Sequence, residues 1–354
     1  MINMISHNKL TFDRKEEIAV KRTVRSGYWA GGNEVKKLEK LITNLTHRKY
    51  AINVSSGLSA LRLSLLALGV KKKDEVIIPA YSCVAIVNAV LSCGATPVLA
   101  DVIINNWNLD SVLVQNKIST NTKAIIAINT FGASADFLIL NDTGIPVIED
   151  CAHAIGQNNK CFFGKQALIS ITSFYATKLV GGGEGGSVMT DNKNIANFIR
   201  DYRDYTDKEP SGQRLNDKMS DIEASISICQ VNRLNSMIKL RKNIAQYYNE
   251  KFSILHNKFP EFIIPTFEDR IWYRYVVCCK KVHANILIEK LRSYGIAACQ
   301  PVENWINKRM SSGFVNAHFA YNHLVSLPIY PTLTNLEREN VVRAVEKTLQ
   351  KIFL

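Results

Sequence analysis

Short apolar runs rich in β-branched residues alternate with helical patterns from about residue 50 to residue 190. The runs are YAINVS, DEVIIPA, TPVLADV, KAIIAINTF, IPVIED and SITSFYA, and LSALRLSLLALGV after the first has amphipathic helical spacing. This alternation predicts an α/β fold with a mostly parallel sheet covered by helices on both faces. In such sheets ligands bind beyond the carboxyl ends of the strands. The polar residues at those ends are the first site candidates: Ser55, Ser56, Asp150, Ser173 and Lys178.

The second half of the chain has a different pattern. From Ser220 the stretch SDIEASISICQVNRLNSMIKLRKNIAQYYNEKF predicts one long helix, and a smaller alternation follows Pro265, with WYRYVVCCK, ANILIEKLRSYGI and SLPIYPTLTNLERENVVRAVEKTLQKI. We therefore expect a large domain over residues 1–235, including an N-terminal segment, and a smaller α+β domain over residues 236–354.

Composition narrows the classes of protein. The 354 residues carry a formal net charge of +13, but the basic residues are dispersed, which favours phosphate-bearing metabolites over nucleic acid. No apolar run approaches the roughly 20 residues that span a bilayer, and the start of the chain lacks an apolar signal core. The eight cysteines include no C-x-x-C pair, so free thiols are expected and no metal site. We expect a cytoplasmic protein that binds neither membrane nor nucleic acid.

The stretch SFYATKLVGGGEGGSVMTD contains an apparent nucleotide motif. Gly181, Gly183 and Gly186 have the spacing G-x-G-x-x-G, but a dinucleotide loop needs a helix to open at the last glycine. Here SVMTD follows, which predicts a strand. The context therefore argues against a dinucleotide site.

Lys178 and Asp150 suggest a different chemistry. Lys178 lies 28 residues after Asp150, and each follows an apolar strand, so both can converge on one site. Pyridoxal phosphate (PLP) needs a lysine amine for its Schiff base and a carboxylate that keeps its ring nitrogen protonated. A lone lysine is usually a solvated surface residue, but this pair has the chemistry that a PLP site needs.

The sequence resembles the DegT/DnrJ/EryC1/StrS family of sugar aminotransferases, which are PLP enzymes of fold type I. The segments that carry the resemblance are VRSGYWAGGNEVKKLEK, VSSGLSALRLSLLALGV, DEVIIPAYSCVAIVNAVLSCGATPVLADV, TKAIIAINTFG, PVIEDCAHAIG, SFYATKLVGGGEGG, LNDKMSDIEASI and SLPIYPTLTNLE, in the family's order. The resemblance implies a mostly parallel seven-stranded sheet between helices in the large domain.

The resemblance also implies roles for individual residues in catalysis. Lys178 matches the Schiff-base lysine, Asp150 the partner of the pyridine nitrogen, and His153 the residue that faces the phenolic oxygen of the cofactor ring.

Gly57, Leu58 and Ser59 match the turn that binds the cofactor phosphate, and Ser173 supplies a hydroxyl to the same phosphate. The stretch SSGLS is equally compatible with a plain helix cap. Asn216 matches an asparagine that reaches into the neighbouring subunit's site, which implies a homodimer with shared active sites.

Four residues depart from the family's pattern. Cys83 stands where an aromatic residue usually stacks on the cofactor ring, and Leu58 where a threonine is common. Asn129 replaces a frequent histidine, and Lys218 replaces an arginine. Candidate sugar contacts are Tyr28 and Trp29 in SGYWAGG, with Trp305 and Arg309 in the small domain.

The resemblance implies a transaminase that moves an amino group from L-glutamate to a keto sugar linked to a nucleotide. Such amino sugars serve surface polysaccharides, including lipopolysaccharide O-antigen, or secondary metabolites. Two alternatives remain open: the same chemistry on a keto sugar or cyclitol ketone without a nucleotide, and a non-catalytic protein that binds PLP or a sugar nucleotide.

Overall fold

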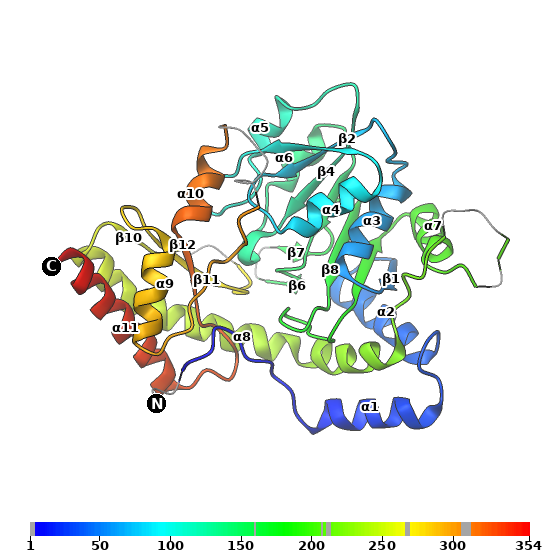
Figure 1. Ribbon diagram of the computed structural model, residues 1–354. Coiled ribbons are helices and arrows are strands. Elements are labelled where there is room, and N and C mark those ends of the chain that lie inside the picture. Colours follow the sequence, from blue (N-terminus) through cyan, green and yellow to red (C-terminus); the bar gives the residue numbers. More distant parts are fainter. Residues whose placement is uncertain (1–3, 159–160, 207, 210–213, 266–269, 306–312) are drawn as a thin grey trace.

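A seven-stranded sheet forms the centre of the large domain in the computed structural model (Figure 1). The structure describes residues 4–158, 161–206, 208–209, 214–265, 270–305 and 313–354. The strands, given in chain order, are β1 (Tyr50–Val54), β2 (Glu75–Pro79), β3 (Thr96–Ala100), β4 (Thr122–Ile128), β5 (Val147–Asp150), β8 (Ile169–Ser173) and β9 (Gly186–Thr190). Their order across the sheet is β1-β9-β8-β5-β4-β2-β3, and only β9 runs antiparallel to its neighbours. The predicted mostly parallel α/β sheet is therefore confirmed.

The strands are apolar on both faces because helices cover both faces. In β2, Val76 and Ile78 join one hydrophobic cluster and Ile77 joins another on the opposite face. The first face is covered by α3 (Gly57–Ala67), α4 (Val84–Ser92) and α7 (Lys193–Tyr202). The second is covered by α2 (Asn33–Thr46), α5 (Ser111–Gln115), α6 (Phe137–Asp142) and the first part of α8 (Asp221–Lys258).

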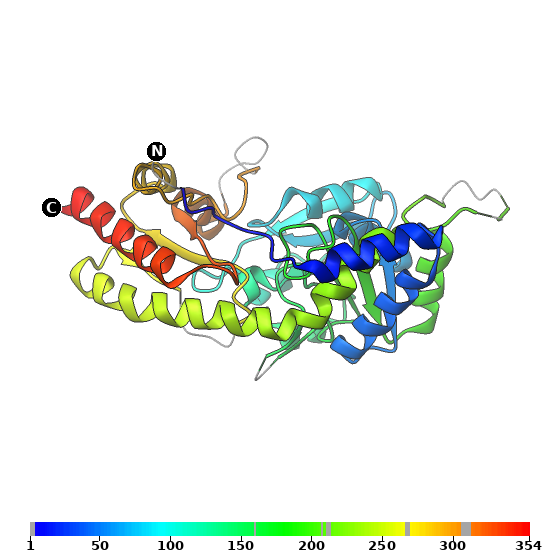
Figure 2. The same ribbon diagram turned by 90° about the horizontal axis from the view of Figure 1, so that it is seen from below.

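A smaller domain follows, as the sequence predicts. Its antiparallel sheet contains β10 (Phe262–Ile263), β11 (Tyr275–Cys279) and β12 (Leu324–Leu327), packed with α9 (Ala284–Ser293), α10 (Val315–His323) and α11 (Asn335–Phe353). Figure 2 shows α8 running along both domains without a break. The division after residue 235 falls inside this helix and stays a prediction.

The remaining elements are short or peripheral. They are α1 (Arg14–Ser26), which packs on α8, the 3-10 turn η1 (Thr130–Gly132), and the small hairpin of β6 (Gly156–Gln157) and β7 (Phe162–Phe163). All eight cysteines are free thiols, as predicted. Among the helices in the described ranges, none combines the length and apolar character needed to cross a bilayer.

The N-terminal segment connects the two domains. The N–H of Ile5 donates to Gly295 at 2.8 Å, and the carbonyl of Ile5 accepts from Ala297 at 2.9 Å, which fixes the segment to the small domain. Three residues on, Asn8 donates to the carbonyl of Thr177 in the loop after β8, at 3.3 Å. Figures 1 and 2 show this segment crossing from one domain to the other. The residue next to Thr177 is Lys178, so the crossing segment supports the candidate lysine.

Asp221 holds α2 against α8. Its buried carboxylate accepts from the N–H groups of Gly32 at 2.7 Å, Glu34 at 2.7 Å and Val35 at 3.2 Å. These are the unpaired donors at the start of α2, which lacks a side-chain cap of its own. The sequence therefore caps one helix with the first residue of another.

We predict that Asp221→Ala lowers the free energy of unfolding by about 2 kcal/mol, because two buried N–H groups and one half-buried N–H group lose a charged acceptor. Urea unfolding midpoints measure the change. The matched control is Asp110→Ala, which removes a cap whose hydrogen bonds to Val112 and Leu113 are exposed, so we expect a loss of less than about 1 kcal/mol. Equal losses in the two variants would contradict this account of the α2–α8 junction.

Candidate active site

A cavity of about 420 Å³ lies at the carboxyl ends of the parallel strands, between the two domains. Asp150 at the end of β5, Ser173 at the end of β8 and Thr130 after β4 all line it. The small domain contributes Tyr273 and Arg274. The site therefore lies where the sheet topology predicts it.

Asp150 is a buried carboxylate at one wall of this cavity. One of its oxygens accepts from the N–H of Ala152 at 2.8 Å. Burial raises the pKa of Asp150, and the Ala152 N–H and the charge of Lys178 oppose that rise only in part. No described lysine or arginine forms an ion pair with Asp150. The site thus holds a carboxylate that a cationic ligand would stabilise.

Lys178 lies in the loop that joins β8 to β9. The loop is closed by backbone hydrogen bonds from Ala176 to Gly183 at 2.9 Å and from Gly182 to Phe174 at 2.7 Å. Gly186 begins β9, so the glycine run joins two antiparallel strands and opens no helix. The prediction that these glycines are not a dinucleotide loop is confirmed.

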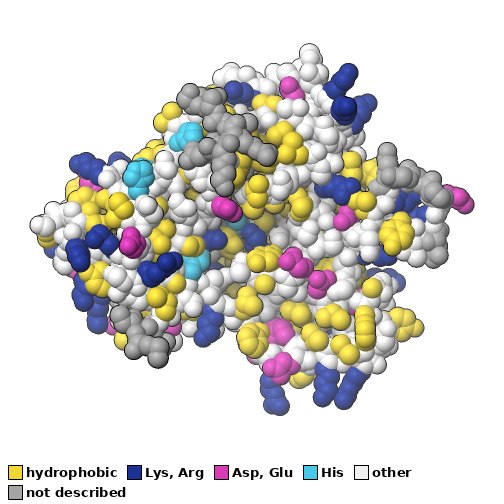
Figure 3. All heavy atoms as spheres, in the orientation of Figure 1, with side chains coloured by type: hydrophobic (Ala, Val, Ile, Leu, Met, Phe, Trp, Pro, Cys, Tyr) yellow, Lys and Arg dark blue, Asp and Glu magenta, His cyan; other side chains and the backbone are white. Residues whose placement is uncertain are grey.

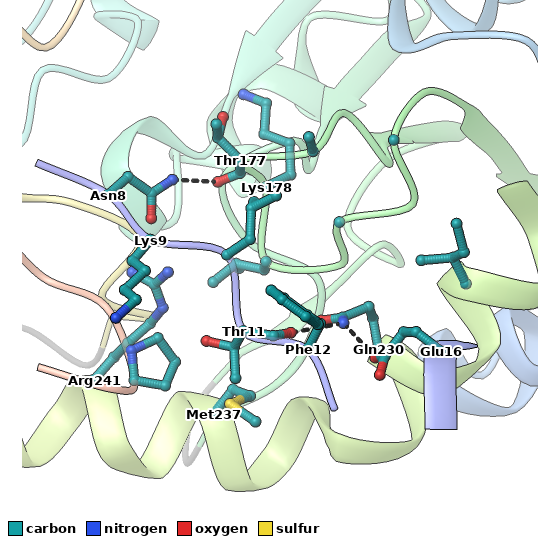
Figure 4. Close-up of a pocket in the computed structure, with 17 residues that line it drawn as sticks. Asn8, Lys9, Thr11, Phe12, Glu16, Thr177, Lys178, Gln230, Met237 and Arg241 are labelled. Atoms are coloured by element: carbon teal, nitrogen blue, oxygen red, sulfur yellow. Dashed lines mark hydrogen bonds between the residues drawn. The ribbon is translucent and has the colours of Figure 1, made fainter. Parts of the chain in front are cut away.

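The Lys178 amine is turned toward the cavity. Its Nζ lies 5.0 Å from the ring centroid of Tyr273, and no described carboxylate lies within ion-pair distance of it. A second, smaller cavity of about 280 Å³ is also lined by Lys178. Figure 4 shows that the Lys178 side chain extends away from Phe12 and Gln230, which line this smaller cavity. The amine is thus available to a ligand in the larger cavity.

His153 is held between two aromatic rings. Its ring centroid lies 4.4 Å from that of Tyr273 and 5.9 Å from that of Phe131, and the N–H of Phe131 donates to its Nδ1 at 3.4 Å. Burial, then the charges of Lys178 and Arg274, keep the pKa of His153 well below its usual value. His153 is therefore neutral at physiological pH and faces the cavity as a neutral imidazole.

The start of α3 meets the end of β8 at close range. A Cβ on Gly57 would lie 2.9 Å from the Cβ of Ser173, so only glycine fits there without displacing a neighbour. The amide N–H groups of Gly57 and Leu58 lie at the helix N-terminus, where orphan donors favour an anion. Ser173 lines the same cavity wall.

Ser59, which the resemblance places in the phosphate-binding turn, has no free hydrogen-bond donor. Its N–H donates to the cap residue Ser56 at 3.0 Å, and its hydroxyl donates to a carboxylate oxygen of Asp217 at 2.9 Å. Both of its donors are therefore already paired. The cap that the sequence allowed as an alternative is present, and it leaves Gly57 and Leu58 as the backbone donors.

Cys83 is the residue before α4, and its side chain is exposed at the cavity wall. Trp305 does not line the cavity. Its indole Nε1 donates to the carbonyl of Ser82 at 2.6 Å, so it supports the backbone beside Cys83 from outside. No aromatic side chain stands at the Cys83 position itself.

The structure does not bring three other candidates to this cavity. Tyr28 and Trp29 are 73% and 54% exposed on the large domain, and Asn216 is also exposed. Arg309 lies outside the described residues. The other two departures do not line the cavity either: Asn129 is buried behind its wall and donates its side-chain amide to Glu149 at 2.9 Å, and Lys218 pairs with Asp204 at 2.8 Å.

Sequence reasoning missed Tyr273, Arg274 and Tyr81, which all line the cavity. The segment before β11 is placed by a hydrogen bond from Ile271 to the carbonyl of Gly132, at 2.9 Å, across the two domains. This contact joins residues that are far apart in the chain. The pattern WYRYVV predicts only a strand, so nothing local marks these side chains as part of a site.

The chain is similar to known aminotransferases over most of its length. The model of the DegT/DnrJ/EryC1/StrS aminotransferase family matches residues 11–346. An uncharacterized protein of Methanocaldococcus jannaschii is 33% identical over 93% of both chains. The dTDP-3-amino-3,6-dideoxy-alpha-D-galactopyranose transaminase of Aneurinibacillus thermoaerophilus is 30% identical over 98% of this chain and 99% of that protein.

Solved structures share the fold. NtdA of Bacillus subtilis, whose structure contains bound pyridoxamine phosphate (PMP), aligns with a TM-score of 0.87 at 24% identity, covering 99% of this chain and 87% of NtdA. The family model spans nearly the whole chain, and the relatives align from end to end. The chain therefore belongs to the DegT/DnrJ/EryC1/StrS aminotransferase family.

Proposed function

We propose that this protein transfers an amino group from L-glutamate to a keto sugar carried on a nucleoside diphosphate. The observation that carries the proposal is the pairing of a free amine, Lys178, with a buried carboxylate, Asp150, around one cavity. Membership of the family makes the chain a sugar aminotransferase of the PLP-dependent class.

The residues present fit PLP. Asp150 is a buried carboxylate without an ion-pair partner among the described residues, which suits a protonated ring nitrogen. The close approach of Gly57 to Ser173 leaves a cradle at the helix N-terminus that a Cβ would fill, which suits a phosphate. In this arrangement Asp150 would hold the ring nitrogen, His153 would face the ring oxygen, and Lys178 would take the reactive carbon.

When bound, PLP supplies an electron sink that stabilises negative charge on a substrate carbon. The chain supplies the proton transfers. Lys178 Nζ would be the base that removes a proton from the donor's Cα and the acid that delivers it to the reactive carbon of the cofactor, because no described carboxylate holds the amine in an ion pair. Asp150 keeps the ring nitrogen protonated, and neutral His153 orients the ring without adding a charge.

Tyr273 completes the surroundings of the lysine. Burial would raise the pKa of its hydroxyl, but the charges of Lys178, Arg274 and Arg241 and a hydrogen bond with Thr177 together outweigh burial, and the pKa is lowered. Its ring covers Lys178 and His153 from the side of the small domain. The small domain thus covers one side of the reacting groups.

The nucleotide-linked acceptor is supported by the relative from Aneurinibacillus thermoaerophilus, whose name describes a dTDP-linked amino sugar. The positive net charge of this chain also suits a diphosphate. A keto sugar or cyclitol ketone without a nucleotide would use the same Lys178 and Asp150. Depletion assays that offer sugar nucleotides and free keto sugars in parallel separate these acceptors.

We further propose a homodimer with shared sites. Asn216 is exposed and outside its own chain's cavity, as expected for a residue that reaches a neighbour. Figure 3 shows apolar side chains gathered over α1, and Ile18 is 61% and Val24 43% exposed there. Exposed apolar residues close together are typical of an interface. Tyr28 and Trp29 continue this surface and would belong to the same interface.

We predict that wild-type protein mixed with PLP develops a visible absorbance band that L-glutamate bleaches. Lys178→Ala should lack the lysine-bound band, because no amine remains at this position to bond the cofactor. Absorbance spectra of wild type and Lys178→Ala, recorded before and after addition of glutamate, measure the band and its bleaching. Lys9→Ala, at an exposed lysine of the N-terminal segment, is the control. A band indifferent to every amino donor would support the non-catalytic alternative.

We predict that Asp150→Asn changes the pH dependence of stability. In protein without cofactor, burial raises the pKa of Asp150, so the stability it contributes is present at low pH and is lost as pH rises through that pKa. The neutral variant should therefore gain stability relative to wild type as pH rises above about 4, the ordinary pKa of an aspartate. Urea unfolding midpoints test this. With PLP bound, wild type should be more stable than Asp150→Asn. A difference in stability that does not change with pH would contradict the role given to Asp150.

We predict that Gly57→Ala weakens cofactor affinity by about tenfold, or about 1.4 kcal/mol, because the added Cβ displaces Ser173 or the start of α3. Equilibrium titration of PLP into the protein measures the change. Gly313→Ala is the matched control, since a Cβ there meets no atom within 4 Å. If both variants bind PLP like wild type, the phosphate lies elsewhere.

A further inference from the structure

Arg274 places a guanidinium in the cavity without a carboxylate partner. Its Nη1 donates to His7 Nε2 at 3.1 Å, to Ser326 Oγ at 3.5 Å and to Cys299 Sγ at 3.7 Å. Its Nε is buried and has no hydrogen-bond partner. Among the described residues none accepts from Nη2, and none forms an ion pair with this side chain. The guanidinium therefore has unused donors in a site that it helps to line.

The neighbours of Arg274 leave its charge uncompensated. Burial, then the charges of Arg274 and Arg241, lower the pKa of His7 to about 4, so His7 is neutral at physiological pH. Ser326 is buried and uncharged. The exposed carboxylates at the cavity mouth, Glu184 and Glu303, form no ion pair with it. A partly buried cation with neutral neighbours is costly unless a ligand supplies the anion.

Tyr81 adds a second unused donor to the cavity wall. Its hydroxyl is buried and has no hydrogen-bond partner. Burial raises the pKa of Tyr81 well above its usual value, and Arg274 lies near enough for its charge to oppose that rise. The phenol therefore keeps its proton and can donate it. Arg274 and Tyr81 together offer the donors that a carboxylate accepts.

We propose that Arg274, assisted by Tyr81, binds a carboxylate of the amino donor. This inference rests on the proposed transamination. Arg274 and Lys178 lie against the same ring, with Cζ 5.4 Å and Nζ 5.0 Å from the centroid of Tyr273. In glutamate the amine and its carboxylates are separated by a few bonds, so one molecule reaches both groups.

A diphosphate fits this position less well. In a sugar nucleotide the diphosphate is attached at the anomeric carbon, several bonds from a ketone elsewhere on the ring. With the ketone held at Lys178, the diphosphate would extend past Arg274. Arg274 therefore selects the donor, and the two half-reactions depend on it differently.

The test measures binding of glutarate, a dicarboxylate without an amine, to PLP-loaded protein by calorimetry. Arg274→Leu should weaken glutarate at least tenfold, because charged hydrogen bonds are lost. Arg274→Lys should recover only part of the affinity, since lysine keeps the charge but not the forked geometry. Tyr81→Phe should weaken glutarate by about threefold. Arg343→Leu, on the exposed face of α11, is the matched control and should bind like wild type.

Kinetics distinguish this role from a structural one. Arg274→Leu should raise the KM for glutamate at least tenfold, while the amine-loaded enzyme reacts with the keto sugar within about twofold of wild type. Thermal midpoints and the PLP absorbance band show whether each variant is folded. Unchanged glutarate affinity in Arg274→Leu, or no glutarate binding by wild type, would overturn the proposal. The proposal would also be overturned if Arg274→Leu weakened only the binding of thymidine or uridine diphosphate and left glutarate binding unchanged.

Failure of the proposed function gives a different pattern. Wild type that binds glutarate through Arg274 but transaminates no donor would remove the transamination and leave a carboxylate site. Wild type that transaminates glutamate with Arg274→Leu unaffected would remove only the role of Arg274.

Discussion

The structure depends on burying the carboxylate of Asp150 at the end of β5. A carboxylate in an apolar environment is costly, and one backbone N–H and the nearby charge of Lys178 offset that cost only in part. A cationic ring nitrogen bound beside Asp150 would supply the missing opposite charge. The same desolvation that raises the pKa of Asp150 in the free protein would thus favour a protonated pyridine, as proposed, and would link cofactor binding to stability.

Three long-range contacts build the cavity around that carboxylate. Ile271 donates to Gly132 and brings the small domain over His153, Asn8 donates to Thr177 and supports the lysine loop, and Arg274 donates to His7. Two of these contacts use the N-terminal segment, which is fixed to the small domain. A shift of the small domain would therefore move Tyr273, Arg274 and the lysine loop together.

The sequence predicts the parts of the site that follow from strand order. Asp150, Ser173 and Lys178 could be predicted because each follows an apolar strand of a parallel sheet, and such ends meet at one edge. The α3 cradle could be predicted because Gly57 follows a strand and precedes a helix. Arg274 and His7 could not, because hydrogen bonds between residues far apart in the chain place them and no local pattern encodes those contacts. Family resemblance also gave Ser59 a role that its pairing with Asp217 leaves without free donors.

Different groups around the cavity would bind different parts of the cofactor and the donor. The proposed phosphate cradle would be weaker than the resemblance implies, because Leu58 lacks a hydroxyl and the Asp217 carboxylate lies against Ser59 near the same helix N-terminus. The usual ring-stacking position holds the small thiol of Cys83. With PLP bound as proposed, cofactor affinity would come mainly from the ends of the ring, through Asp150 and a covalent bond to Lys178. In the proposed reaction a donor that displaces Lys178 would remove one of these two attachments. A carboxylate anchored at Arg274 would then also keep the cofactor and substrate in place while the lysine moves protons.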